Sequence, residues 1–189
     1  MTIHNNCKKI PLNLSDKIQI FLDYLIPLVF IIISTVLLIF NKIPKWYIYF
    51  FLTGFSLGAP FEFIQPRIGW VYYYKCITYK IAPIKIMWII HAIWDSLILF
   101  LILLTSFYIW GAKLFTQYNH KAGFFMATMG MIIEIFFESH QTIWYYKPNK
   151  FNPVWAIING RQMTLQQWHW AFLPVIYYII LINFISPPF

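Results

Sequence analysis

The chain has 189 residues, of which 60% are hydrophobic, 22% aromatic and only 11% charged. Globular domains average about 25% charged residues, so this composition predicts a polytopic membrane protein with a single domain. The net charge of +8 does not indicate nucleic-acid binding, because the basic residues lie between apolar segments, where they orient a membrane protein. Two cysteines, Cys7 and Cys76, indicate neither a disulfide framework nor a zinc cluster.

Five apolar segments are predicted to cross a bilayer as helices, for which about 20 residues suffice. They cover residues 18–40, 46–65, 86–110, 122–137 and 167–185, and the fourth is the shortest. Pro60 is expected to kink the second helix just before Glu62. In the same helix, Gly54-x-x-x-Gly58 permits close contact with another helix. The expected fold is all-α, a five-helix transmembrane bundle.

Lysine and arginine are distributed unevenly between the two sides of this bundle. Of the 14 basic residues, one side holds only Lys42, Lys45, Lys113 and Lys121. The other ten lie in the N-terminal tail, the second loop and the fourth loop. By the positive-inside rule, we expect a multi-pass protein with a cytoplasmic N-terminus and an external C-terminus.

Part of the chain recurs 72 residues later. The motif Gly-x-x-x-Glu at residues 58–62 returns at residues 130–134, and Asp23 and Asp95 share that offset. Acidic residues are scarce in this chain, so two pairs at one offset predict an internal repeat of a two-helix unit. A third, half copy is predicted to begin at Trp168-His169.

Ionisable residues within the apolar segments fall at one predicted depth, on the cytoplasmic side. Glu62 and Glu134 lie near helix ends, His91 and Asp95 share a face of the third helix, and His169 opens the fifth. Because such groups are costly in a membrane, they mark a functional site by default. We therefore expect one polar chamber open to the cytoplasm.

Aromatic residues crowd the same predicted side of the membrane. Interfacial belts explain part of this, but belts normally occupy both interfaces. Aromatic faces could also stabilise a cationic intermediate. The candidate substrate-binding residues are Trp70, Tyr73, Trp88, Trp94, Trp144, His169 and Trp170.

No metal site or cofactor is predicted. Neither a Glu-x-x-His nor a His-x-x-x-His pair occurs, and these are the usual ligand spacings on helices. Dinucleotide fingerprints and phosphate-binding glycine loops are also absent from the sequence.

Two stretches of the chain resemble membrane enzymes of carotenoid metabolism. Residues 56–96 resemble integral-membrane carotenoid hydratases through Gly58, Glu62, Gly69, Trp70, Tyr73, Tyr74, Pro83, Ile84 and Trp88. Residues 130–174 are similar to the approach to the acid motif in membrane lycopene cyclases, through Trp144-Tyr145-Tyr146, Pro148 and Gly160. The cyclases carry paired acids where this chain has Gln166 and Gln167. The membrane residues His91, Asp95 and Glu134 also resemble those of small five-helix sterol isomerases and sterol-binding proteins.

These resemblances imply acid-catalysed chemistry on a lipid. A carboxylic acid in a low-dielectric site can stay protonated near neutral pH and donate its proton to a carbon–carbon double bond. A second carboxylate or His91 can later remove a proton. We expect an enzyme that cyclises, hydrates or isomerises an isoprenoid or other lipid. Glu62 and Glu134 are the expected acid and base, supported by Asp95 and His91.

Other functions use the same features. A non-enzymatic lipid- or sterol-binding protein and a small transporter both stay open as alternatives. A transporter needs a polar path to the external side, where the helices carry few polar residues: Ser34, Thr35, Thr105, Ser106 and Asn183. The residues His91 and Asp95 could instead form a structural pair between helices. Asp23, Glu138 and His169 could simply reach water at the membrane surface. If the protein is an enzyme or a lipid-binding protein, its partner is a membrane lipid or another hydrophobic small molecule.

Overall fold

The computed structural model describes residues 13–44, 46–64, 71–73, 84–140, 144–146 and 148–185. This part of the chain contains five helices long and apolar enough to cross a membrane, as predicted. They contain α1 (Leu14–Ile39), α2 (Trp46–Ile64), α4 (Ile84–Trp110), α5 (His120–His140) and α6 (His169–Ile180). The fifth of these spans, Leu165–Phe184, is longer than α6 because it includes the turns on either side of it. Three single turns flank them: η1 (Gly111–Phe115), η2 (Leu165–Trp168) and η3 (Leu181–Ile185).

Helices α1 and α5 extend beyond the predicted bounds because polar residues continue them past their apolar parts. At the start of α1, Asn13 caps the helix through reciprocal hydrogen bonds with Asp16, at 2.8 and 2.9 Å. The expectation that the fourth helix is the shortest is wrong: α5 has 21 residues and α2 has 19. Hydropathy marks only the apolar middle of α5, whereas the helix runs from His120 to His140.

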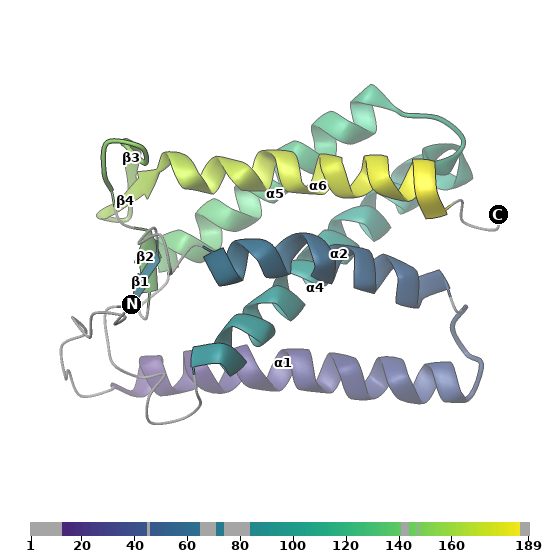
Figure 1. Ribbon diagram of the computed structural model, residues 1–189, viewed down its shortest axis with the longest axis horizontal. Coiled ribbons are helices and arrows are strands. Elements are labelled where there is room, and N and C mark those ends of the chain that lie inside the picture. Colours follow the sequence, from purple (N-terminus) through teal and green to yellow (C-terminus); the bar gives the residue numbers. More distant parts are fainter. Residues whose placement is uncertain are drawn as a thin grey trace.

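Successive helices run in opposite directions between the two ends of the bundle, and α4 and α5 are inclined to α1, α2 and α6 (Figure 1). As a result, the end of α2, the start of α4, the end of α5 and the start of α6 meet at one end of the bundle. We call this the hairpin end, because it carries the hairpin of β3 (Val154–Ile158) and β4 (Arg161–Thr164). Asn159 and Gly160 form its turn with φ angles of 51° and 72°, the conformation that Asn-Gly adopts in tight hairpins.

A second small sheet also lies at the hairpin end. Strand β1 (Val71–Tyr73) pairs antiparallel with β2 (Trp144–Tyr146), with Tyr72 opposite Tyr145. The two aromatic clusters that follow Glu62 and Glu134 in the sequence are therefore hydrogen-bonded to each other. These two sheets correct the all-α expectation in detail, although the fold remains mainly helical.

Glycines set the two most extensive helix contacts among the described elements, α2 with α4 and α5 with α6. A Cβ placed on Gly58 would lie 2.6 Å from the Cβ of Asp95. A Cβ on Gly130 would collide with the backbone carbonyl of Trp170 and lie 2.9 Å from Pro174. The helices approach this closely only because these positions lack side chains. The predicted contact at Gly54-x-x-x-Gly58 is thus confirmed.

The apolar core fills the middle of the bundle and the half opposite the hairpin end. Its largest fully buried side chains include Phe50, Leu103, Met126, Tyr177 and Tyr178. Both tyrosine hydroxyls donate to backbone carbonyls, Tyr177 to Phe50 at 2.9 Å and Tyr178 to Leu114 at 2.7 Å. The buried hydroxyls are therefore satisfied within the protein.

Candidate functional site

An ionisable pair at the hairpin end joins α2 to α4. Glu62 lies one turn after Gly58, and its Oε2 is 3.3 Å from Nδ1 of His91. The two side chains remain 17% and 16% exposed, respectively. This pair therefore combines a carboxyl with an imidazole, both of them partly exposed.

Asp95 continues this arrangement into the protein. It lies one turn after His91 on α4, is only 8% exposed, and has its carboxylate against Gly58. It interacts electrostatically with both Glu62 and Glu134. Glu134, on α5, is only 6% exposed. The three carboxylates expected to act together thus come from three helices and influence one another.

The first helix joins the cluster through Asp23 and Trp94. The indole Nε1 of Trp94 donates a hydrogen bond of 3.0 Å to the backbone carbonyl of Asp23. The Asp23 carboxylate interacts electrostatically with His91. On its other side, the Trp94 ring lies 6.4 Å from the ring of Phe137 on α5. Trp94 thus ties α1 and α5 to α4, and its expected contact with substrate stays a prediction.

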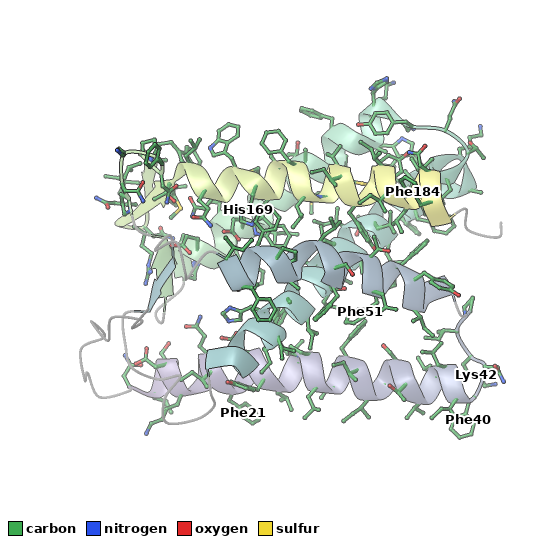
Figure 2. The ribbon with its side chains drawn as sticks, in the orientation of Figure 1. Phe21, Phe40, Lys42, Phe51, His169 and Phe184 are labelled. Carbon is green, nitrogen blue, oxygen red and sulfur yellow. The ribbon has the colours of Figure 1, made fainter. Side chains whose placement is uncertain are left out.

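His169 enters the cluster from the start of α6 (Figure 2). Its Nδ1 lies 2.6 Å from the backbone carbonyl of Gln166. Its ring stacks on Phe61 of α2, with centroids 5.2 Å apart and planes inclined by 19°. Its neighbour Trp170 is 4% exposed and packs against Gly130 through its backbone. Phe61 is the residue before Glu62, so this stack brings His169 beside the Glu62–His91 pair.

Six carboxyl and imidazole groups, drawn from all five helices, therefore belong to one arrangement at the hairpin end. We call it the polar cluster, and its members are Asp23, Glu62, His91, Asp95, Glu134 and His169. Their common depth in the bundle was predicted from the sequence. The contacts above show how these groups are linked.

Several expected substrate-binding side chains cannot be placed in this arrangement. Trp70 lies outside the described residues. Tyr73, Trp88 and Trp144 belong to β1, α4 and β2 by their backbone, and their side chains lie outside the described part. Their expected roles stay predictions.

Sequence reasoning missed two residues of the site, Phe61 and Gln166. Phe61 is one aromatic residue among many, and only its stacking on His169 distinguishes it. Gln166 is 9% exposed, and both polar atoms of its carboxamide are buried without a hydrogen-bond partner in the described part of the chain. A buried polar group without a hydrogen-bond partner destabilises the fold by about 1–3 kcal/mol. Such groups are typical of sites where a water or a ligand completes the hydrogen bonding.

Glu138 is 1% exposed and lies one turn beyond Glu134. It does not reach water at the membrane surface, so that interpretation is wrong. Among the described residues, no three His, Cys, Asp or Glu side chains are grouped so that they could hold a metal ion. The site is therefore described by its own carboxyl and imidazole groups.

No protein-family model, characterised protein or solved structure matches this chain. The resemblances to carotenoid hydratases, lycopene cyclases and sterol isomerases accordingly rest on the sequence motifs alone.

Proposed function

We propose that the protein is an integral membrane enzyme that acts on a carbon–carbon double bond of a lipid. By donating and removing protons, it shifts the double bond or adds a group across it. The observation that carries this proposal is the Glu62–His91 pair. A partly exposed carboxyl lies 3.3 Å from an imidazole, beside the buried Asp95, in an otherwise apolar bundle. Ionisable groups at such a place are costly, and they mark a functional site by default.

The surface of the bundle supports insertion into a membrane. Only 6% of the most apolar stretch of α1 is buried, against 44% for α4. Phe21 and Phe40 project from the outer side of α1 and are 61% and 67% exposed (Figure 2). An apolar face of this extent is unfavourable in water, and lipid chains would cover it.

In the proposed reaction, Glu62 is the general acid. Its carboxyl proton adds to one carbon of the double bond, whose π electrons form the new C–H bond and leave a carbocation at the other carbon. A second ionisable group of the polar cluster then removes a proton from a neighbouring carbon, and that C–H pair forms the new double bond. The internal repeat nominates Glu134 for this second role. His91 positions Glu62 and helps to return a proton to it, and Asp95 influences the protonation state of the other groups in the polar cluster.

The proposed duplication of a two-helix unit has geometric support. Gly58 and Gly130 lie at corresponding helix crossings, α2 with α4 and α5 with α6. The copies α1–α2 and α4–α5 run in the same directions, and their aromatic clusters pair antiparallel as β1 and β2. This is the relation expected of parallel repeats about an axis along the membrane normal.

A transporter is less compatible with the half of the bundle opposite the hairpin end. Three of its polar side chains hydrogen-bond to their own helices, each at 2.8 Å: Thr105 to Leu101, Ser106 to Ile102 and Asn183 to Ile179. These groups are occupied locally and offer no polar path among the described residues. The absence of such a path among these residues favours an enzyme over a transporter.

Turnover of an unsaturated isoprenoid or sterol by purified variants tests this function. Glu62→Gln keeps the side-chain shape but cannot exchange a proton, so it should lower turnover about 10²- to 10⁴-fold. Glu134→Gln should have the same effect if Glu134 is the group that removes the second proton. Glu62→Asp is the matched control, because it keeps a proton-exchanging group and should retain part of the activity. Melting temperatures in detergent would establish that the variants are folded.

Two results would count against the proposal. Full turnover by Glu62→Gln would eliminate the carboxyl as the acid. Lipid that binds equally to wild type and Glu62→Gln, without any turnover by either, would instead identify a lipid-binding protein.

A further inference from the structure

His169 has one ring nitrogen committed by the backbone. A carbonyl oxygen only accepts hydrogen bonds, so the 2.6 Å contact with Gln166 requires that Nδ1 of His169 carries a proton. In the neutral ring, Nε2 is then without a proton and is a hydrogen-bond acceptor. The local fold therefore selects the tautomer that leaves Nε2 available as a base.

The ring is also held in place from two directions. Phe61 stacks on it from α2, with centroids 5.2 Å apart, and Trp170 follows it with centroids 5.6 Å apart. The backbone of Trp170 packs directly on Gly130 of α5, which fixes the start of α6 against that helix. A base held this firmly loses little entropy when it meets a substrate.

The position of the ring relates it to the proton donor. Phe61 and Glu62 are adjacent in α2, and His169 interacts electrostatically with Glu62. By contrast, Glu134 is only 6% exposed, and it is therefore buried more deeply than Glu62, which is 17% exposed. His169 thus shares the partly exposed side of the cluster with the acid.

We propose that His169, acting through Nε2, is the proton acceptor of the reaction. This inference rests on the proposed function and replaces Glu134 in the second role. After Glu62 has protonated the double bond, Nε2 takes a proton from a carbon next to the carbocation, and that C–H electron pair forms the new double bond. His169 becomes an imidazolium and Glu62 a carboxylate. Transfer of the proton between them, through solvent at the hairpin end, restores both groups without another reactant.

The variant that tests this role is His169→Asn. The Asn amide nitrogen can replace Nδ1 as donor to the Gln166 carbonyl, but nothing replaces Nε2. His140→Asn is the matched control, because His140 makes the same kind of bond, Nδ1 to the Phe136 carbonyl at 2.7 Å, and its side chain is exposed on α5 outside the polar cluster. We expect His169→Asn to lower lipid turnover about 10²- to 10⁴-fold and His140→Asn to leave it unchanged.

A second measurement reads the tautomer without any substrate. Protein labelled with ¹⁵N-histidine is compared with His169→Asn by NMR, which assigns the His169 signals by their loss. We expect a protonated Nδ1 and an unprotonated Nε2. A protonated Nε2 beside a bare Nδ1 would overturn the inference.

The turnover assay separates the two failures. Full activity of His169→Asn, with wild type and Glu62→Asp active and Glu62→Gln inactive, removes His169 alone and returns the role to Glu134. A wild type that turns over no unsaturated lipid removes the proposed function, and the acceptor role of His169 with it.

Discussion

Glu62 differs from the other carboxylates of the polar cluster in its surroundings. It is 17% exposed and has a histidine partner, whereas Asp95 and Glu134 are 8% and 6% exposed. A general acid has to meet the substrate, so this exposure favours Glu62 as the donor. Asp95 and Glu134, being more deeply buried, are better placed to influence its charge than to touch a lipid.

Gly130 makes the tightest helix contact described, and its substitution is a test at the scale of single residues. Alanine favours a helix over glycine by about 1 kcal/mol. At Gly130, however, the added Cβ would meet the Trp170 carbonyl, which belongs to the backbone and cannot rotate away. We expect overpacking, which typically costs about 1–3 kcal/mol, to outweigh the gain and to lower the melting temperature in detergent.

Thr128→Ala is the control for this measurement. Thr128 is exposed on the same helix, and its hydroxyl bonds only to the Phe124 carbonyl one turn earlier. A Gly130→Ala variant that melts at or above the temperature of Thr128→Ala would show that α5 and α6 do not cross as closely as described.

The sequence was enough to predict that members of the polar cluster lie at one depth in the bundle. It was not enough to predict which of them contact one another. Acids and histidines are rare in apolar segments, so Glu62, His91, Asp95 and Glu134 were identifiable once the helices were placed. The role of Phe61 was not, because its contact with His169 depends on how α2 and α6 meet. The buried carboxamide of Gln166 likewise follows from packing rather than from any local pattern.

At the scale of elements, the helices were predictable and the small sheets were not. Long apolar runs predict helices reliably, and errors arose where polar residues such as Asn13 and His140 belong to a helix end. The β3–β4 hairpin carried a usable signal in Asn159-Gly160, which favours a tight hairpin turn. The pairing of β1 with β2 had no local signal, because it joins segments more than 70 residues apart.

Exposure of α1 also sets it apart among the helices. At the hairpin end it is attached to the bundle by the hydrogen bond from Trp94 to the Asp23 carbonyl. Further along, the ring of Phe30 contacts the ring of Phe51, with centroids 5.7 Å apart. Most of its remaining surface is apolar and exposed. In the proposed enzyme, this face of α1 would lie against lipid beside the polar cluster, and substrate would arrive from the bilayer.

For the whole molecule, we predict that the hairpin end faces the cytoplasm. The charge distribution favours this orientation. Lys42 lies at the end opposite the hairpin end (Figure 2), whereas Lys150 follows β2 and precedes β3, both of which lie at the hairpin end (Figure 1). With Cys7 and Cys76 replaced by serine, single cysteines at positions 42 and 150 should react with a membrane-impermeant reagent in intact cells only at position 42. Labelling of position 150 alone would show that the orientation is the opposite of the one predicted. Labelling of both positions would refute the five-helix topology.

The central claim is that Glu62 transfers a solvent-exchangeable proton to a lipid double bond. It is tested most directly by incubating the wild-type protein with an unsaturated isoprenoid or sterol in deuterated buffer and analysing the product by mass spectrometry. The proton of a carboxyl exchanges with solvent, so the product should carry deuterium on carbon, and Glu62→Gln should form no labelled product. A product formed without deuterium, or equal labelling by Glu62→Gln, would contradict the account.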